Sequence, residues 1–463
     1  MPRSATVVLC CGILAACAAP RPGPATDPAA PGSPEHFPST YEPLPSTPVL
    51  ITNATILTGD GKRLDAASIL LRDGRIEAVG PNLRAPADAH VVDGSGKWVT
   101  PGIIDNHSHL GVYATPAVAA HSDGNEMSGP NTAEVWAEHA VWPQDPGFDA
   151  ARAGGVTTMQ VLPGSANLFG GRTVTLKNVP ARTTQAMKFP GAPQGLKMAC
   201  GENPKRLYGS RQAFPMTRMG DVAGYRMAFS KAFDYREKWR AWADGTVTAR
   251  PDRDLQLETL VAVLEGEILV HHHCYRADEM AQVLDVAREF GYRVSSFHHA
   301  TEAYKIGDLL AASDVCASIW ADWWGFKLEA WDGIRENAAL LHAAGACVVV
   351  HSDSDTGIQR LNQEAAKAMA SGRNMGIDID EGEAIRWLTA NPARTLGIAD
   401  RTGTLVPGMM ADVVVWDGNP FSVYTRAEKV YIDGALAYDR SDAARQPKSD
   451  FMLGIIETTG GLQ

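Results

Sequence analysis

The chain has 463 residues, of which 45% are hydrophobic, and a formal net charge of −11. This length is too great for one small core and suits a large domain with a second, smaller one. The acidic balance argues against nucleic acid as a partner, and no apolar run reaches the length that a bilayer-spanning helix needs.

The first residues have the pattern of an export signal and are left out of the fold prediction. An apolar run over residues 5–16 ends in a Leu-Ala-Ala-Cys sequence whose cysteine is Cys17. This ending resembles a bacterial lipobox, in which the cysteine is lipidated; the alternative is an ordinary cleaved signal peptide that happens to contain cysteine. We therefore predict a signal peptide over 1–17 and a Pro-rich tether over 18–47. The protein would be lipid-anchored in the bacterial cell envelope on the periplasmic side, in the outer rather than the inner membrane.

Two segments with short strand-like runs lie at opposite ends of the remaining chain. Residues 48–101 and 403–440 both contain apolar runs separated by Asp-Gly pairs, which are typical of hairpin turns. The similar texture predicts that the two segments form one small β-sandwich domain together.

Between these segments, over residues 102–402, apolar strand-like runs alternate with helical stretches such as 277–290 and 334–344. Such alternation predicts an α/β fold with a parallel sheet, and a (β/α)8 TIM-like barrel fits the length. In such barrels the chemistry lies where strands end. Polar residues at the ends of the apolar runs are therefore the candidates for a functional site.

Histidine, lysine or aspartate occurs at the ends of successive apolar runs. His107 and His109 are two positions apart, which on a β-strand puts both imidazoles on one face. Two neutral imidazoles that converge are a usual start of a zinc-type site. Histidine and aspartate are mostly partly exposed, so packing does not easily explain their recurrence at strand ends. The later runs contribute Lys197, His271, His272, His273, His298, His299, His351 and Asp353.

These runs and their flanks resemble the amidohydrolase superfamily, the metal-dependent (β/α)8 hydrolases. The likeness extends over residues 48–440 and includes Pro-Gly-Ile-Ile-Asp-Asn-His-Ser-His at 101–109 and Asn-Pro-Ala-Arg-x-Leu-Gly at 391–397. It is greatest for the imidazolonepropionase-like and prolidase-like branch, whose sixth strand ends in a His-Gly-Thr-Glu-Ala-Tyr-type run. This sequence has Ala300 where that run usually has glycine.

The resemblance implies two divalent metal ions, one held by two histidines and an aspartate, the other by two histidines, with a carboxylated lysine as bridge. In this sequence these residues are His107, His109 and Asp353, then His273 and His299, then Lys197. Glu202 is the alternative bridge. Zinc is the metal that such ligands favour, while manganese or cobalt, and one ion in place of two, stay open.

We predict a hydrolase that cleaves a C–N bond, amide or peptide-like, in a small substrate such as a dipeptide or an N-acyl amino acid. The metals would activate water and polarise the carbonyl, and Asp353 would move the proton from water to the leaving amine. The alternatives are a ring deaminase or cyclic-amide hydrolase of the same superfamily, and a non-catalytic ligand-binding lipoprotein. The only membrane contact expected is the lipid anchor, and the sequence leaves a homo-oligomer open.

Several other residues are weaker candidates for substrate contact. A glycine-rich loop brings Asn167 and Arg172, which suit a carboxylate or carbonyl, and His271, Tyr275 and Arg276 follow or end a strand. An aromatic loop over 320–326 either walls the pocket or only packs. His272 and His298 are expected to be structural, and His351 to orient a ligand or line the mouth.

Four cysteines lie beyond the signal segment, each in or beside an apolar run: Cys200, Cys274, Cys316 and Cys347. Their spacing matches no thiolate metal motif. Export permits disulfides, but we predict that these cysteines are buried free thiols.

Overall fold

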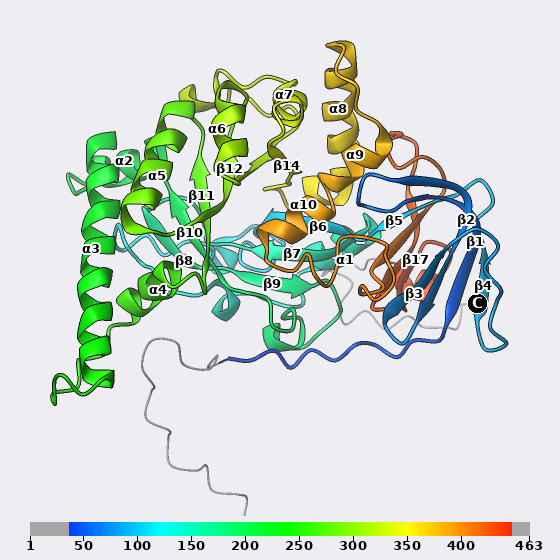
Figure 1. The fold of residues 1–463 in the computed structure, drawn as a ribbon, viewed down its shortest axis with the longest axis horizontal. Helices are drawn as coiled ribbons and strands as arrows, with labels where there is room; N and C mark the ends of the chain where they lie inside the picture. The colour runs from blue at the N-terminus through cyan, green and yellow to red at the C-terminus, as the bar shows by residue number, and fades with distance from the viewer. Residues whose placement is uncertain (1–36, 447–463) are drawn as a thin grey trace, which may run out of the picture.

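A computed structural model describes residues 37–446 (Figure 1). Cys17, the signal segment and most of the tether lie outside the described residues, so the lipid anchor stays a prediction. In the described part of the chain, no helix is both long and apolar enough to cross a membrane.

Strands from both ends of the chain form one eight-stranded sheet, in the order β17-β16-β15-β5-β1-β2-β3 with β4 beside β1. The link between the ends is the antiparallel pairing of β15 (Val413–Trp416) with β5 (Trp98–Pro101). The other strands are β1 (Val49–Leu57), β2 (Arg63–Arg72), β3 (Arg75–Gly80), β4 (His90–Asp93), β16 (Ala427–Ile432) and β17 (Ala435–Asp439). Ile51, Ile69 and Val413 belong to its apolar core. That these strands form a β-sandwich domain, with the predicted boundaries, stays a prediction.

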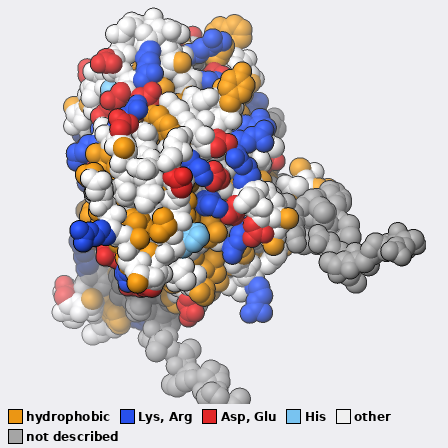
Figure 2. All heavy atoms as spheres, turned by 90° about the vertical axis from the view of Figure 1, so that its right-hand side faces the viewer, with side chains coloured by type: hydrophobic (Ala, Val, Ile, Leu, Met, Phe, Trp, Pro, Cys, Tyr) orange, Lys and Arg blue, Asp and Glu red, His pale blue; other side chains and the backbone are white. Residues whose placement is uncertain are grey.

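Figure 2 shows the surface of the molecule at the end that carries this sheet. Acidic and basic side chains are interspersed over the face drawn, with apolar side chains between them.

The middle of the chain forms two further sheets. The six-stranded one has the order β14-β13-β12-β11-β10-β8, and the three-stranded one β6-β7-β9. Neighbours from β10 to β14 are parallel, whereas β8 and β9 run antiparallel to their partners. The bounds are β6 (Ile103–Ser108), β7 (Val156–Val161), β8 (Phe169–Arg172), β9 (Val174–Lys177), β10 (Gly195–Ala199), β11 (Leu269–Cys274), β12 (Val294–His299), β13 (Cys316–Ile319) and β14 (Cys347–Val350).

The α/β class is thus confirmed, but closure of a barrel is not. Over residues 37–446, no strand pairing joins the six-stranded to the three-stranded sheet. Between β14 and β6 the chain segment 387–388 intervenes: the amide of Val350 donates to the carbonyl of Trp387, and the amide of Ile104 to that of Leu388. The first and last strands of the predicted barrel are therefore linked through a third segment.

Helices follow most of the central strands and cover them. They are α1 (Pro146–Ala153), α2 (Glu202–Ser210), α3 (Arg218–Ala243), α4 (Leu255–Leu264), α5 (Ala277–Phe290), α6 (Gly307–Ala312), α7 (Asn337–Ala343), α8 (Leu361–Asn374), α9 (Glu381–Arg386) and α10 (Ala390–Thr395). The predicted helix over 277–290 is confirmed as α5; it buries Met280, Val283 and Leu284 and ends at Gly291, whose φ of 77° suits glycine. The predicted helix over 334–344 is shorter, as α7.

The prediction of free thiols is wrong, because the four cysteines form two disulfides, Cys200–Cys274 and Cys316–Cys347. Cys316 and Cys347 are register partners at the starts of β13 and β14. Cys200 follows β10, and Cys274 ends β11, its parallel neighbour. The paired cysteines are 74 and 31 residues apart in the sequence, so the sequence alone does not indicate the pairing, which depends on the register of the strands.

A buried ion-pair cluster joins β9 to the eight-stranded sheet. The Nζ of Lys177 lies 2.9 Å from both carboxylate oxygens of Asp412 and 3.0 Å from Oδ1 of Asp433. All three residues are buried, and Thr402 donates a further hydrogen bond to Asp412. The cluster fixes the small sheet relative to the strands that carry the site.

Candidate metal centre

The end of β6 carries the two histidines that open the site, and Asp105 holds this end in place. One oxygen of Asp105 accepts hydrogen bonds from the backbone amides of His107 (3.1 Å) and Ser352 (3.3 Å), and the other accepts one from the Ser352 hydroxyl. Burial raises the pKa of Asp105 to about 7, against the effect of these hydrogen bonds. Asp105 therefore connects β6 to the turn that follows β14.

The ring of His109 is oriented so that one nitrogen is available to a metal. Its Nδ1 donates to the carbonyl oxygen of Leu162 over 2.9 Å. A neutral imidazole has one protonated nitrogen, so Nε2 keeps its lone pair. That Nε2 points toward Asp353, whose Oδ1 is 3.2 Å away.

Asp353 lies among three imidazoles. Its Oδ1 is also 3.3 Å from His107 Nε2, and its Oδ2 is 3.7 Å from His299 Nδ1. The residue has a left-handed φ of 49°, a conformation that the surrounding structure must hold in a residue other than glycine. Burial favours the neutral acid, but the contacts with His109 and the other imidazoles hold the pKa of Asp353 well below its usual range.

Two further histidines come from the neighbouring strands β11 and β12. The ring centroids of His273 and His299 are 4.5 Å apart, and those of His107 and His299 are 4.8 Å apart. His299 has a φ of 71°, and Ala300, where the resembled family has glycine, follows with 40°. Two successive positive φ values in residues other than glycine mark a strained backbone at the end of β12, where His299 lies.

Lys197 is fully buried on β10, in register with His271 of β11. Its Nζ has no hydrogen-bond partner among the described residues. Burial lowers the pKa of Lys197 to about 7, against the charge of Asp353, which raises it. The amine is therefore neutral in a large fraction of molecules at neutral pH.

The buried polar atoms of this cluster fit a bound cation. Within residues 37–446, His107 Nε2, His273 Nδ1 and His299 Nδ1 have no hydrogen-bond partner. Such atoms are costly unless something satisfies them, and imidazole nitrogen with carboxylate oxygen is a zinc-type donor set. In two groups the possible ligand atoms all lie within 4.8 Å of one another: His107, His109 and Asp353, and His107, His299 and His351.

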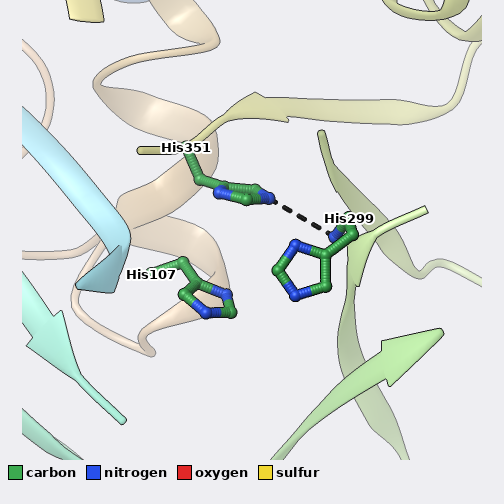
Figure 3. Close-up of side chains that lie close together, drawn as sticks. All are labelled: His107, His299 and His351. Atoms are coloured by element: carbon green, nitrogen blue, oxygen red, sulfur yellow. Dashed lines mark hydrogen bonds between the residues drawn. The ribbon is translucent and has the colours of Figure 1, made fainter. Parts of the chain in front are cut away.

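The second group includes His351, for which the sequence predicted either of two roles: orienting a metal ligand or lining the mouth of the site. Figure 3 shows its ring facing His299. The Nε2 of His351 accepts the backbone N–H of His299 over 3.3 Å, which places the proton of the neutral ring on Nδ1. Its lone pair is thereby engaged, so His351 positions His299 rather than offering a free ligand.

A cavity of about 550 Å³ opens over the cluster. Its lining includes His109, His273, His299 and Asp353, with Tyr113, Asn125, Asn203, Arg206 and Tyr275 around them. Sequence reasoning missed Tyr113, Asn125, Asn203 and Arg206. They stand in loops or on α2, away from the strand ends that drew attention.

The glycine-rich loop does not bring its two candidates to this cavity. Asn167 is buried, and its amide donates to the carbonyls of Glu126 and Gly129. Arg172 donates to Thr259 and Gln194, both at 2.8 Å. Both side chains hold loops together and are absent from the lining.

Of the other weaker candidates, some line the cavity and others do not. Tyr275 lines the cavity, while Arg276 pairs with Asp278 at 2.9 Å and is not part of the lining. Glu202, the alternative bridge, lies 3.6 Å from Lys327. His271 is buried in a line of hydrogen bonds beneath the centre.

Part of the aromatic loop belongs to the site. Trp320 stacks on His299, with ring centroids 4.3 Å apart, and Trp323 stacks on Trp320 at 5.3 Å. Trp323 and Phe326 are 41% and 57% exposed, so residues 323–326 face solvent, whereas Ala321 is buried. Trp320 therefore walls the centre, and the outer part of the loop lies at the surface.

Comparisons with known proteins agree with this geometry. The amidohydrolase family model matches residues 270–438. A solved amidohydrolase structure from Thermotoga maritima MSB8 is 36% identical, with a TM-score of 0.78, and the match covers 85% of this chain and 100% of that one.

Two curated relatives extend the likeness. Amidohydrolase tasK of Hapsidospora irregularis is 32% identical over 451 residues, which are 89% of this chain but 45% of the relative, so the chain spans less than half of that protein's length. An imidazolonepropionase of Mesorhizobium japonicum is 25% identical over 374 residues, 76% of this chain and 87% of the relative. The superfamily usually binds divalent metal, and the clustered histidines and aspartate of this chain are suitable ligands for such an ion. The chain thus belongs to the amidohydrolase family and is a hydrolase of carbon–nitrogen bonds.

Proposed function

We propose that this amidohydrolase cleaves an amide or peptide-like bond in a small, carboxylate-bearing substrate, such as a dipeptide or an N-acyl amino acid. The observation that carries the proposal is the position of Asp353, an ionised carboxylate within 3.7 Å of three imidazoles at the floor of a cavity. A proton-accepting group beside metal-type ligands suits hydrolysis better than mere ligand binding.

In this proposal His107, His109 and Asp353 hold one divalent cation, and His273 and His299 hold a second. Zinc suits the donors, and the central sheets would be parts of a (β/α)8 barrel whose strand ends carry them. Bound there, divalent cations supply Lewis-acid polarisation of the scissile carbonyl and acidify water.

Lys197 would bridge the two ions as a carbamate. Its neutral amine nitrogen attacks the carbon of CO2, a C–N bond forms, one C=O pair of electrons moves to oxygen, and the nitrogen loses one proton to solvent. The product is a carboxylate-like group. Burial and a pKa of about 7 favour this step, because only the neutral amine is a nucleophile. The contact of Glu202 with Lys327 makes it the weaker alternative.

Asp353 would act as general base and then as general acid. Its low pKa keeps it ionised at neutral pH, so it accepts the proton of the attacking water. It then delivers that proton to the leaving nitrogen, which must be protonated to depart as an amine. The backbone hydrogen bond from Asp353 to His107 holds the carboxylate during both transfers.

Arg206 would select the carboxylate of the substrate. It lines the cavity and forms no ion pair with any residue that the structure describes. Lys327, by contrast, is engaged with Glu202 and with Asn203. A guanidinium is suited to bidentate binding of a carboxylate.

The test is a panel of dipeptides, N-acyl amino acids, their C-terminal amides, cyclic amides and amino-substituted rings, assayed with metal-loaded protein. Turnover of the free acids, with kcat/KM lower for the neutral amides and the preference reduced in Arg206→Gln, supports the proposal. Exclusive turnover of rings would instead identify a deaminase or cyclic-amide hydrolase. Absence of turnover with every substrate in the panel would favour a binding protein.

A further inference from the structure

A line of hydrogen-bonded side chains runs from the candidate metal centre into the protein interior. His107 Nδ1 lies 2.8 Å from His298 Nδ1, and His298 Nε2 lies 3.0 Å from His271 Nδ1. The line ends where His271 Nε2 meets the side-chain amide of Gln160 at 3.1 Å. All four residues are at most 1% exposed, so water does not supply alternative partners.

The three rings of this line are fully buried, and burial disfavours a charged imidazole, so each ring is neutral. A neutral imidazole carries one proton, so it donates through one nitrogen and accepts through the other. Each nitrogen–nitrogen contact also needs one proton between its two atoms. The three rings must therefore be ordered together, and only two orders satisfy every contact.

The two orders have opposite consequences for His107. In the first, His107 donates from Nδ1, His298 donates from Nε2 and His271 donates from Nε2, which leaves His107 Nε2 bare and able to bind a metal. In the second, every hydrogen bond is reversed: Gln160 donates to His271, His271 donates from Nδ1 to His298, and His298 donates from Nδ1 to His107. The proton of His107 then lies on Nε2, which cannot be a ligand.

Gln160 decides between the orders, because it is the last group in the line. The first order requires an oxygen opposite His271, and the second requires an N–H. In the structure the amide nitrogen of Gln160 faces both His271 and Thr173 Oγ1, and Gln160 Oε1 has no partner in the described part of the chain.

A half-turn of the Gln160 side-chain amide would exchange its nitrogen and oxygen, so that the oxygen faces His271. The oxygen would then accept from His271 Nε2–H and from the hydroxyl of Thr173, whose own oxygen already accepts the amide of Gly195 at 2.9 Å. The side-chain amide of glutamine is chemically able to present either end.

We propose that Gln160 is a positioning residue for the metal centre: acting through His271 and His298, the orientation of its amide sets the tautomer of His107 and thereby its ability to bind a metal. The inference rests on the proposed function only in that His107 binds through Nε2. It predicts that metal binding is coupled to a side chain that does not touch the metal.

The first test reads the tautomers directly, by nitrogen NMR of protein labelled with ¹⁵N-histidine and loaded with Zn²⁺. His271 and His298 should both carry their protons on Nε2, with a nitrogen–nitrogen coupling across each hydrogen bond of the line. A loaded protein in which His271 is protonated on Nδ1 overturns the proposal. This NMR measurement needs no substrate, so its result does not depend on whether the protein catalyses the proposed hydrolysis.

The second test changes the end of the line and measures the Kd for Zn²⁺ by competition with a chelator. Gln160→Glu, which offers only acceptors, should bind Zn²⁺ at least as tightly as the unaltered protein and should fix the first order even without metal. Gln160→Met, of similar size but with no acceptor oxygen, should bind about tenfold more weakly or worse.

The same pair of substitutions at Gln194 is the matched control, because this partly buried glutamine contacts Arg172 and lies outside the line. Both Gln194 variants should bind Zn²⁺ like the unaltered protein. Equal Zn²⁺ affinity in Gln160→Met and the unaltered protein, or equal losses in Gln160→Glu and Gln160→Met, would overturn the proposal. If Gln160→Met does not fold, Gln160→Glu and the tautomers of the unaltered protein still decide.

Discussion

The backbone amide of Asp353 donates a hydrogen bond to the carbonyl oxygen of His107 over 3.0 Å. The bond joins the turn after β14 to the end of β6, although no strand pairing connects these two strands. The proposed base and the first histidine of the site are thus held at a fixed separation by the main chain, and their side chains meet at 3.3 Å. Preorganisation of this kind is what a hydrolytic centre requires.

Replacement of Asp353 by asparagine should remove the proton acceptor while the fold is kept. We expect kcat to fall by about 10²- to 10⁴-fold, the contribution usual for general acid–base catalysis. Steady-state kinetics on the best substrate of the panel and circular dichroism would measure both effects. Asp355→Asn is the matched control, since Asp355 is exposed two positions further on and should leave kcat unchanged. Equal activity in the two variants would contradict the role given to Asp353.

Removal of metal should abolish hydrolysis and lower the stability of the fold. A ligand that binds only the native state adds about 2.7 kcal/mol at a free concentration 100 times its Kd, so Tm should rise when Zn²⁺ is returned. Elemental analysis of the loaded protein should give two ions per chain. One ion per chain would favour the deaminase alternative, and hydrolysis that survives complete chelation would rule out the metal-dependent mechanism.

Carboxylation of Lys197 should depend on pH. The folded pKa of about 7 is below the unfolded value of 10.5, so the protonated amine is the form that folding disfavours. Below pH 7 the amine is mostly charged and unreactive toward CO2; above it the neutral form dominates. Reactivation of metal-free protein by Zn²⁺ and bicarbonate should therefore speed up as pH rises through 7. A ¹³C carbamate signal from labelled bicarbonate, lost in Lys197→Met, would identify the group, and its absence from active protein would exclude it.

Lys177→Met should destabilise the protein strongly. The substitution leaves Asp412 and Asp433 buried without their cation, which typically costs about 3–5 kcal/mol. Lys97→Met provides the comparison, because Lys97 pairs with Glu428 where both side chains are at least 20% exposed, and such pairs contribute about 0–1 kcal/mol. Urea unfolding followed by fluorescence would give both values. Similar losses in the two variants would mean that the buried cluster contributes little.

Cys17→Ser tests the predicted lipid anchor, on which the described residues have no bearing. When cells are fractionated, the Cys17→Ser protein should be found in the soluble periplasmic fraction and no longer in the membrane. The reason is that stable anchoring needs two or more acyl chains, which the serine cannot carry. An alanine substitution at Cys11 should leave the distribution unchanged. A Cys17→Ser protein that stays membrane-bound would point to an uncleaved signal segment or to a membrane partner.

Much of the site could be predicted because it lies at strand ends. The carboxyl ends of parallel strands share one edge, so His273 and His299 had to be neighbours once their strands were recognised, and the structure brings them together. Residues elsewhere gave no such signal. Arg206 reaches the cavity from α2, and Gln160 lies inside β7, where a polar residue between apolar ones has no distinguishing pattern.

The rest of the fold depended on contacts that a sequence does not display. The disulfides required the register of β13 on β14, and the intervening segment 387–388 required knowledge of how β14 approaches β6. Arg172 looked like a ligand for carboxylate in its glycine-rich loop, but it packs over Trp136 instead. Local pattern indicates what a residue is able to bind, and tertiary packing decides what it meets.

The two disulfides have a practical consequence for anyone who prepares the enzyme. One cross-link ties the ends of β10 and β11, directly beside His273, and the other ties the starts of β13 and β14. Protein made in a reducing cytosol would carry four thiols in their place, and thiolates compete with imidazole for zinc. Expression in an oxidising compartment should therefore give material whose zinc content reports on the histidine centre, whereas cytosolic material would mix that content with zinc captured by cysteine.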